Sequence, residues 1–394
     1  MTVKFRKRRQ DTMDSLLLIS PALWFVSSLR TLVSVIFFVV MTACTIPQTG
    51  EMTAERVTSH RLTVSVKTFA GTDTRKGYAD GKGTAARFLY PGQMVFDKQD
   101  NLYVIDQLYG YVGGSVVRKI DAQGNVTTFA KGLSAITDIC IDPADGKTIY
   151  VIESGDQTSV PNGIFRIDAN GIVKRLSGGA GLRGYEDGPL VTAKFNRPGG
   201  IAMDNKGNLF VADAGNYCVR KVNLKTGMVT TLAGQHLPGQ TNCFYADGHG
   251  KAAQFCAFDD LTLDDAGNVF VPDRMNHRVR RVTSGGDVST YLQIGGAGTV
   301  EGPLANAKVW YPTMAHFHTG SGQLYLITDS GKQLDVVTRD NYLFNLSRYI
   351  GQNDYVNSST GTTHGYYGLA VNSKGELFIA DKYNHCIRKI IVSW

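Results

Sequence analysis

Long helical patterns are nearly absent from this 394-residue sequence, and charged residues are scarce. Asp, Glu, Lys and Arg make up 19% of the chain, whereas soluble domains usually carry about a quarter. Glycine is abundant, with 44 residues, and proline is modest, with 11. A chain with few helical patterns and many turn-forming residues is typical of an all-β fold.

Several functional signatures are missing as well. The sequence contains no Gly-x-Ser-x-Gly nucleophile elbow and no phosphate-binding loop, which argues against an esterase of the elbow type and a P-loop nucleotidase. No Cys-x-x-Cys pair occurs among the six cysteines, which argues against a zinc ribbon or a redox motif. No basic stripe with interleaved aromatic residues is present, so we expect no nucleic-acid partner.

The N-terminal segment has the features of a secretory signal. A basic cluster (residues 4–9) precedes two apolar runs within residues 16–40, which only Arg30 divides. The stretch before Cys44 resembles a bacterial lipoprotein lipobox, although Met41 stands where leucine is usual. The resemblance implies that Cys44 is lipidated. A plain membrane anchor is the alternative, and Arg30 counts against it because it interrupts the span that a bilayer requires.

We therefore divide the chain into a signal peptide (1–43), the lipidated cysteine with a linker (44–61) and one folded domain (62–394). The signal peptide holds six Lys and Arg and two Asp and Glu residues, so its removal lowers the net charge from +7 to near +3. We expect a monomer in the cell envelope, held to the outer membrane by lipid. The sequence leaves open which side of that membrane it faces.

A seven-residue pattern recurs along the folded domain. Its clearest form is Gly207 to Asp213, and its six copies are 47 to 60 residues apart. The copies end at Asp106, Glu153, Asp213, Asp273, Thr328 and Asp381. A strand and a tight turn precede nearly every copy, and two further strands follow the first five. Four antiparallel strands, repeated six times, predict a six-bladed β-propeller, because packing blade against blade buries sheet faces that one blade leaves exposed.

The last repeat ends shortly after Ile390, which leaves it without an outer strand. Residues 64–71 resemble the fourth strand of the third repeat, residues 228–234. We therefore expect this N-terminal strand to complete the last blade.

The repeat has a recognisable signature, Asp-x-x-Asn-His-x-[Ile/Val]-Arg-[Lys/Arg], at residues 273–281 and 381–389. It resembles the NHL repeat, and the match covers residues 62–394. The whole chain resembles NHL-repeat lipoproteins of Bacteroidota-like bacteria. Some NHL-type propellers are enzymes that use several histidine ligands, which cannot be placed in this sequence.

The loops that lead into the innermost strands are long, whereas the opposite face carries tight turns. Because function concentrates on loops set on a rigid frame, we predict a ligand site at the axial mouth of the long-loop face. The predicted residues are Tyr90, Gln93, Asp138, Arg197, Asp259, Asp260, Trp310, Tyr311 and Tyr367. Carboxylates beside aromatic rings suit a polyhydroxylated ligand or a cation. Alternatively, the carboxylates hydrogen-bond to neighbouring blades or to channel water.

The sequence commits to no cofactor. Calcium or another divalent ion would suit Asp138 and Asp260, and His316 is a third weak metal candidate. His316 and His318 alternate along a strand and so face one side of it.

Two further features concern the loops. A Tyr-x-Asp-Gly motif at Tyr78, Tyr185 and Tyr245 precedes an Ala-x-Phe or Ala-x-x-Phe segment; it indicates a turn with packing, and a sugar-stacking rim is the alternative. Cys243 and Cys256 flank one loop, thirteen residues apart, and a disulfide between them would contribute about 3 kcal/mol.

These features predict a lipid-anchored binding module that presents its long-loop face to a glycan or a partner protein in the envelope. A further, separate hypothesis is a purely structural partner of an outer-membrane uptake complex. The alternative is a divalent-metal-dependent lyase or hydrolase with its site at the axial mouth. Fold alone does not choose between them.

Overall fold

The computed structural model describes residues 63–72, 75–108, 114–155, 162–178, 183–236, 244–294, 298–350 and 366–393. The chain divides into two units, residues 1–48 and 49–394, and every described residue belongs to the second. Regular structure there is almost entirely β-strand, which confirms the all-β prediction. Within the described ranges, no helix is long and apolar enough to cross a membrane.

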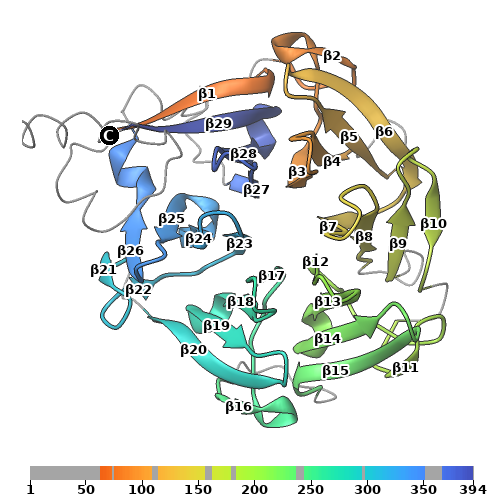
Figure 1. The fold of residues 1–394 in the computed structure, drawn as a ribbon, viewed down its shortest axis with the longest axis vertical. Coiled ribbons are helices and arrows are strands. Elements are labelled where there is room, and N and C mark those ends of the chain that lie inside the picture. Colours follow the sequence, from red (N-terminus) through yellow and green to blue (C-terminus); the bar gives the residue numbers. More distant parts are fainter. Residues whose placement is uncertain are drawn as a thin grey trace, which may run out of the picture. The chain divides into compact units, whose positions relative to one another are not determined.

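The strands form six sheets arranged around an axis (Figure 1). Blade 1 contains β3 (Pro91–Phe96), β4 (Leu102–Gln107), β5 (Ser115–Ile120), β6 (Asn125–Leu133) and β2 (Gly81–Lys82). Blade 2 contains β7 (Ile136–Ile141), β8 (Ile149–Glu153), β9 (Gly163–Ile167) and β10 (Val173–Arg175). Blade 3 contains β12 (Ile201–Met203), β13 (Asn208–Asp213), β14 (Cys218–Asn223), β15 (Met228–Gly234) and β11 (Gly188–Pro189).

The second half of the ring repeats this order, from the innermost strand outward. Blade 4 contains β17 (Thr262–Leu263), β18 (Val269–Asp273), β19 (Arg278–Val282), β20 (Asp287–Ile294) and β16 (Gly248–His249), and β22 (Lys308–Val309) pairs with β20. Blade 5 contains β23 (Met314–His318), β24 (Gln323–Thr328), β25 (Gln333–Val337), β26 (Tyr342–Asn345) and β21 (Gly302–Pro303). Blade 6 contains β27 (Tyr366–Val371), β28 (Leu377–Asp381), β29 (Cys386–Ser393) and β1 (Thr63–Gly71).

Short 3-10 turns join some of these strands. They are η1 (Gly83–Ala85), η2 (Ala214–Asn216), η3 (Gly250–Ala252), η4 (Arg274–Asn276), η5 (Asp329–Gly331), η6 (Leu346–Tyr349) and η7 (Lys382–Asn384). The turns η2, η4 and η7 follow the second strands of blades 3, 4 and 6, and each ends at a residue in the left-handed conformation, as C-terminal caps often do.

The N-terminal strand completes the last blade, as the sequence predicts. β1 pairs with β29 in antiparallel register, from Thr63 opposite Ser393 to Gly71 opposite Cys386. Figure 1 shows β1 (orange) lying along β29 (dark blue). Strands from the two ends of the domain therefore close the ring through hydrogen bonds and packing.

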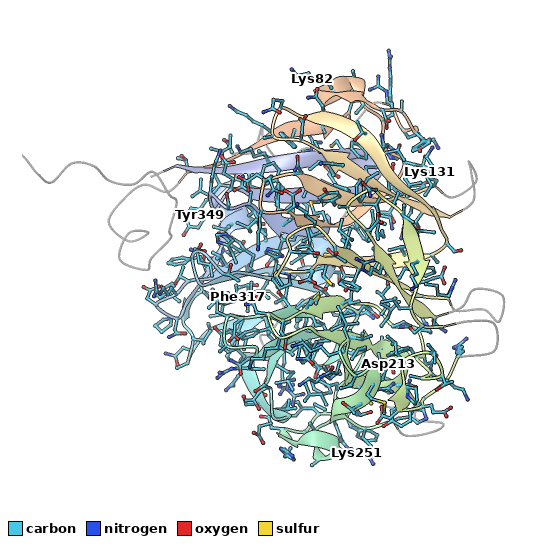
Figure 2. The ribbon with its side chains drawn as sticks, turned by 45° about the vertical axis from the view of Figure 1, so that its right-hand side comes forward. Lys82, Lys131, Asp213, Lys251, Phe317 and Tyr349 are labelled. Carbon is cyan, nitrogen blue, oxygen red and sulfur yellow. The ribbon has the colours of Figure 1, made fainter. Side chains whose placement is uncertain are left out.

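Apolar side chains fill the spaces between neighbouring blades (Figure 2). Six hydrophobic clusters each combine residues of two adjacent blades, and together they account for all six interfaces of the ring. In β13, Leu209 and Val211 face blade 2, whereas Phe210 and Ala212 face blade 4. Because successive side chains alternate between the faces of a strand, a second strand buried on both sides must be apolar throughout.

Candidate functional site

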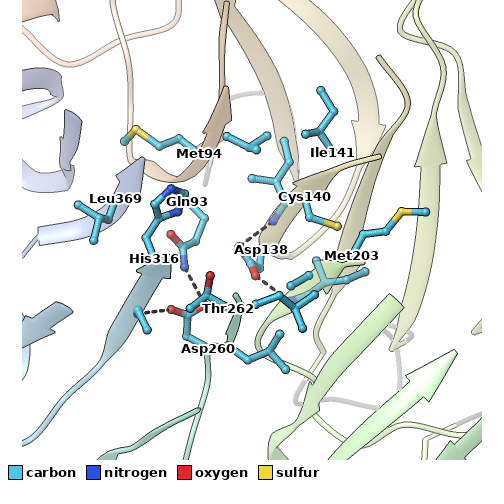
Figure 3. Close-up of a pocket in the computed structure, with 17 residues that line it drawn as sticks. Gln93, Met94, Asp138, Cys140, Ile141, Met203, Asp260, Thr262, His316 and Leu369 are labelled. Atoms are coloured by element: carbon cyan, nitrogen blue, oxygen red, sulfur yellow. Dashed lines mark hydrogen bonds between the residues drawn. The ribbon is translucent and has the colours of Figure 1, made fainter. Parts of the chain in front are cut away.

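The first strands of the six blades surround a cavity of about 160 Å³ on the propeller axis (Figure 3). Three predicted mouth residues, Gln93, Asp138 and Asp260, line this cavity together with His316. Apolar side chains, including Met94, Met203 and Leu369, form much of the remaining wall. Polar groups from blades 1, 2, 4 and 5 therefore meet apolar side chains in one small cavity.

Asp138 connects blade 2 to blade 3. Its Oδ1 accepts a hydrogen bond from the backbone N–H of Ile139 at 2.8 Å. Its Oδ2 accepts one from the backbone N–H of Ile201, in β12 of the next blade, at 2.7 Å (Figure 3). The carboxyl thus satisfies a buried donor at the innermost edge of blade 3.

Asp260 plays the same part between blades 4 and 5. Its Oδ2 accepts a hydrogen bond from the backbone N–H of Ala315 in β23 at 2.8 Å. In addition, Gln93 Nε2 of blade 1 donates to Asp260 Oδ1 at 3.3 Å, so this bond spans the axis between opposite blades. These contacts agree with the alternative interpretation of the sequence, in which the carboxylates hydrogen-bond to neighbouring blades.

Both axial carboxyls are almost fully buried, with 6% of Asp138 and 4% of Asp260 exposed. Burial raises the pKa of each, and the charge of Asp260 raises the pKa of Asp138 further. The backbone donors at Ile201 and Ala315 act in the opposite direction. The pair therefore favours its neutral form more than exposed carboxyls would.

His316 adds a neutral imidazole to the cavity wall. Burial, with a smaller effect from His318, lowers the pKa of His316 to about 4, so the ring is uncharged near pH 7. His318 lies further along β23, where its Nδ1 contacts Ser321 Oγ at 2.9 Å. Among the residues that the structure describes, no group of three or more His, Cys, Asp and Glu is arranged to hold a metal ion.

The other predicted mouth residues lie on the rim rather than in the cavity wall. The Asp259 carboxylate forms an ion pair with Arg274 at 3.0 Å, and both side chains are partly exposed. Trp310 stacks on His277 with 3.8 Å between ring centroids. The backbone N–H of Tyr311 donates to His277 Nδ1 at 3.2 Å, so His277 connects blade 4 to the loop that leads into blade 5.

A second group on the rim, which we call the rim cluster, contains Tyr90, Tyr367, Lys382, Tyr383 and His385. Tyr383 contacts Tyr367 and Tyr90 edge-on, with ring centroids 5.5 and 6.4 Å apart. The ring of His385 lies 5.8 Å from that of Tyr90, and its Nδ1 contacts the carbonyl oxygen of Leu89. Blades 6 and 1 thus share one aromatic surface.

The sequence predicts Tyr90 and Tyr367 at the mouth but not the other three members of the rim cluster. His385 occupies a fixed position of the repeat signature, which favours a structural role, whereas Lys382 and Tyr383 occupy its two variable positions. One signal in the sequence could have pointed to this surface. Position 383 is a tyrosine, whereas the corresponding positions in blades 3 and 4 are Gly215 and Met275, so only the last of these three blades has an aromatic residue there.

The backbone at the mouth is constrained. Arg197 and Tyr311 adopt left-handed conformations, with φ of 49° and 48°, which are uncommon for bulky residues and occur often at functional sites. Next to Arg197, a Cβ on Gly199 would lie 2.4 Å from the carbonyl oxygen of Asp259. Glycine therefore allows the first strands of blades 3 and 4 to approach closely.

The aspartate of the Tyr-x-Asp-Gly motif is partly exposed and pairs with a buried arginine in three blades. In blade 3, the fully buried Arg220 donates to Asp187 of the motif and to Asp213 of β13, both at 2.6 Å. The Tyr185 hydroxyl contacts Thr231 Oγ1 at 2.9 Å, and the Arg220 guanidinium lies 4.9 Å from the Tyr185 ring. Blades 1 and 4 repeat this arrangement around Arg118 and Arg280. The turn-and-packing interpretation accounts for these contacts, but the sequence analysis did not find the buried arginines.

A larger hollow, of about 520 Å³, lies on the opposite, tight-turn face. Its walls are the turns between the first and second strands of the blades. The carboxylates there are engaged within their own turns: Asp204 accepts backbone hydrogen bonds from Lys206 and Asn208 at 2.9 and 2.8 Å. Such Asx-type contacts stabilise the turns themselves.

The described cysteines are of two kinds. Cys140, Cys218 and Cys386 are buried thiols outside any disulfide, and Cys256 is disulfide-bonded. Cys243, the partner that we predict for Cys256, lies outside the described residues, as do Cys44 and the whole signal peptide. The pairing and the lipidation therefore stay predictions.

The ring of six sheets, its closing strand and the Asp-x-x-Asn-His turns define a β-propeller built from NHL-type repeats, and residues 368–390 match the NHL repeat. The chain belongs to the SMP-30/gluconolactonase/LRE-like family, whose model matches residues 39–251, more than half of the chain. Both assignments agree with the six-bladed NHL propeller that the sequence predicts.

Similar proteins come from different kingdoms. The chloroplastic protein SUPPRESSOR OF QUENCHING 1 of Arabidopsis thaliana is 26% identical over 67% of this chain, a match that spans 26% of that protein's length. A structural-genomics protein of Bacteroides thetaiotaomicron has a TM-score of 0.62 at 18% identity, over 84% of this chain and 76% of its own. An auxiliary nutrient binding protein of the same organism has a TM-score of 0.60 at 15% identity, over 85% and 78%. At these identities the structural likeness shows a common fold.

Proposed function

We propose that the protein is a cell-envelope binding propeller, anchored through lipidated Cys44, which holds a glycan or a partner protein on its long-loop face. The observation that carries this proposal is the rim cluster. Its rings are partly exposed, with 41% of Tyr383 accessible, and they come from two blades. Exposed aromatic rings held on a rigid frame are typical of recognition surfaces.

The axial carboxyls have structural partners, and the binding proposal does not require them to act as catalytic groups. Both oxygens of Asp138 and both of Asp260 already accept hydrogen bonds from the protein. A general acid or base must instead reach a substrate atom within hydrogen-bond distance. The Bacteroides neighbour named as an auxiliary nutrient binding protein is consistent with a binding role at the level of the fold.

A glycan screen on the full-length protein in detergent tests the proposal. We expect retention of at least one glycan class, and we expect Tyr383→Ala with Tyr367→Ala to abolish it. Lys206→Met, on the opposite face, is the control and should bind normally. If the control lost binding and the rim variant kept it, the tight-turn hollow would be the site instead.

A divalent-metal-dependent lyase or hydrolase is the second candidate, because Asp138, Asp260 and His316 line one cavity. The described residues do not fit a complete metal site, and we derive no metal-dependent step. Metal analysis of the purified protein, with Asp138→Asn and Asp260→Asn, separates the candidates. Metal-dependent turnover that these variants abolish would favour the enzyme over the binder.

A further inference from the structure

Lys382 is a half-buried cation on the long-loop face. It begins η7, directly after β28, and its Nζ lies 4.6 Å from the ring centroid of Tyr367 and 6.0 Å from that of Tyr383. The corresponding residue of blade 4 is Arg274, whose guanidinium is neutralised by Asp259 at 3.0 Å. Lys382 has no such ion pair within the described part of the chain.

Among the described residues, this environment leaves the ammonium group without a carboxylate partner. An ammonium carries three N–H donors, and aromatic faces replace only part of the hydration that it loses. Burial lowers the pKa of Lys382, and no described carboxylate counteracts the effect. A carboxylate supplied by a ligand would restore both charge neutrality and hydrogen bonds.

The neighbouring rings restrict what that ligand can be. Tyr367 and Tyr383 stand at 84° to each other beside the ammonium, and Tyr90 extends the surface into blade 1. A sugar ring has apolar C–H faces that pack on aromatic rings and hydroxyl groups that bond to polar tips. Rings beside a cation that has no ion pair within the described ranges therefore suit a sugar that carries an acid group.

A second cation lies at the same mouth. Arg197 is exposed, its backbone is held in the left-handed conformation, and it has no ion pair among the described residues. Arg197 lies in the loop that enters blade 3, and blade 3 is opposite blade 6 in the ring. A polymer with several acid groups can contact both cations, whereas a single neutral sugar leaves both unused.

We propose that the ligand of the long-loop face is an acidic saccharide, with Lys382 binding a carboxylate and Tyr367 and Tyr383 packing against the sugar ring. This inference rests on the proposed function and names the chemical class of its ligand. An acidic peptide would also supply carboxylates, but an acidic side chain has no ring whose C–H face can pack on Tyr367 or Tyr383.

Calorimetric titration of the full-length protein in detergent tests the inference. The probes are an oligogalacturonate, its fully methyl-esterified form and polyglutamate of similar length. We expect the oligogalacturonate to bind and the ester to bind at least tenfold more weakly. Lys382→Met should weaken oligogalacturonate binding by roughly 10- to 100-fold, the range of one charge-assisted contact. Binding should also weaken as salt rises.

Two further variants complete the design. Lys382→Arg keeps the charge and should retain more affinity than Lys382→Met. Lys206→Met removes a lysine from the opposite face and should bind as the unaltered protein does. Matching thermal unfolding curves for the two methionine variants would show that lost binding reflects lost contacts rather than unfolding.

The outcomes separate this inference from the proposed function. Equal binding of acid and ester, unaffected by Lys382→Met but abolished by Tyr383→Ala, would overturn the acidic class and leave the glycan-binding function intact. Binding of polyglutamate with the same Lys382 dependence, and of neither saccharide, would overturn the saccharide in favour of a peptide. Failure of all three probes to bind would overturn the inference, while retention of another glycan would keep the proposed function.

Discussion

Asp335 occupies, in blade 5, the register position at which blades 1, 3, 4 and 6 carry Arg118, Arg220, Arg280 and Arg388. Its Oδ2 accepts hydrogen bonds from Thr328 and Thr299 at 2.5 and 2.9 Å, and its Oδ1 is buried without a hydrogen-bond donor. Burial raises the pKa of Asp335 to about 7, while the two threonine hydroxyls act to lower it. A single residue thus replaces a cation by a carboxyl that resists ionisation.

This position makes stability depend on pH. The folded pKa is about 7 and the unfolded value is near 3.9, so between them the folded state binds more protons and stability falls as pH rises. We expect Asp335→Asn, which stays neutral, to raise the melting temperature relative to the unaltered protein increasingly from pH 5 to about pH 7, with the difference levelling off between pH 7 and pH 8. Thermal unfolding of both proteins across that range measures the difference, and a difference that stays constant with pH would contradict the argument.

At the scale of the blade, buried arginines connect three strands and the entering loop through side chains. Arg220 in β14 contacts Asp213 in β13 and Asp187 in the loop before β12, and the backbone N–H of Thr231 in β15 donates to the same Asp187 at 3.2 Å. Buried charges require such partners, because desolvation is otherwise uncompensated. Hydrogen bonds between the strands set their order in the sheet. The arginine, through Asp187, holds the entering loop and the fourth strand against the second and third strands.

We expect Arg220→Met to destabilise the protein by about 3–5 kcal/mol, because it leaves Asp213 buried beside no cation. Chemical denaturation measures the loss. Adding Asp213→Asn should restore part of it by removing the uncompensated charge, so the two changes should not be additive. Lys225→Met, on the exposed turn of the same blade, is the control and should change stability by less than about 0.5 kcal/mol. Additive effects would show that the pair does not act as a unit.

The repeat itself was readable from the sequence, because each second strand alternates its contacts between two neighbouring blades and is apolar throughout. The two-residue outer strands, such as β11, were not readable, since Gly188 and Pro189 carry turn chemistry, and the neighbouring Asp187 is held by a distant residue, Arg220. The axial residues Asp138 and Asp260 were placed by register alone. Their hydrogen bonds to Ile201 and Ala315 depend on the distance between blades, which no local pattern contains.

At the scale of the molecule, the ring consists of six similar interfaces, of which one differs in connectivity. Five pairs of neighbouring blades are consecutive in the chain, whereas blade 6 and blade 1 meet where the chain returns. Within blade 6, β1 supplies the outer strand, and its Val64 is buried with Leu369 and Ile390 in the cluster between blades 5 and 6. Closure therefore depends on keeping β1 paired with β29.

We expect Val64→Asp to weaken this closure more than any other part of the ring. The substitution places a carboxylate at a site that is 2% exposed, and burying an unpaired charge is strongly unfavourable. Loss of β1 pairing leaves the backbone of β29 exposed along one edge. Hydrogen exchange should therefore accelerate first at Ile387 to Ile390, before the second strands of blades 2 to 4.

Lys67→Asp introduces the same residue at an exposed position of β1 and should leave the exchange pattern unchanged. Uniform acceleration across all blades would instead mean that the ring opens only by global unfolding.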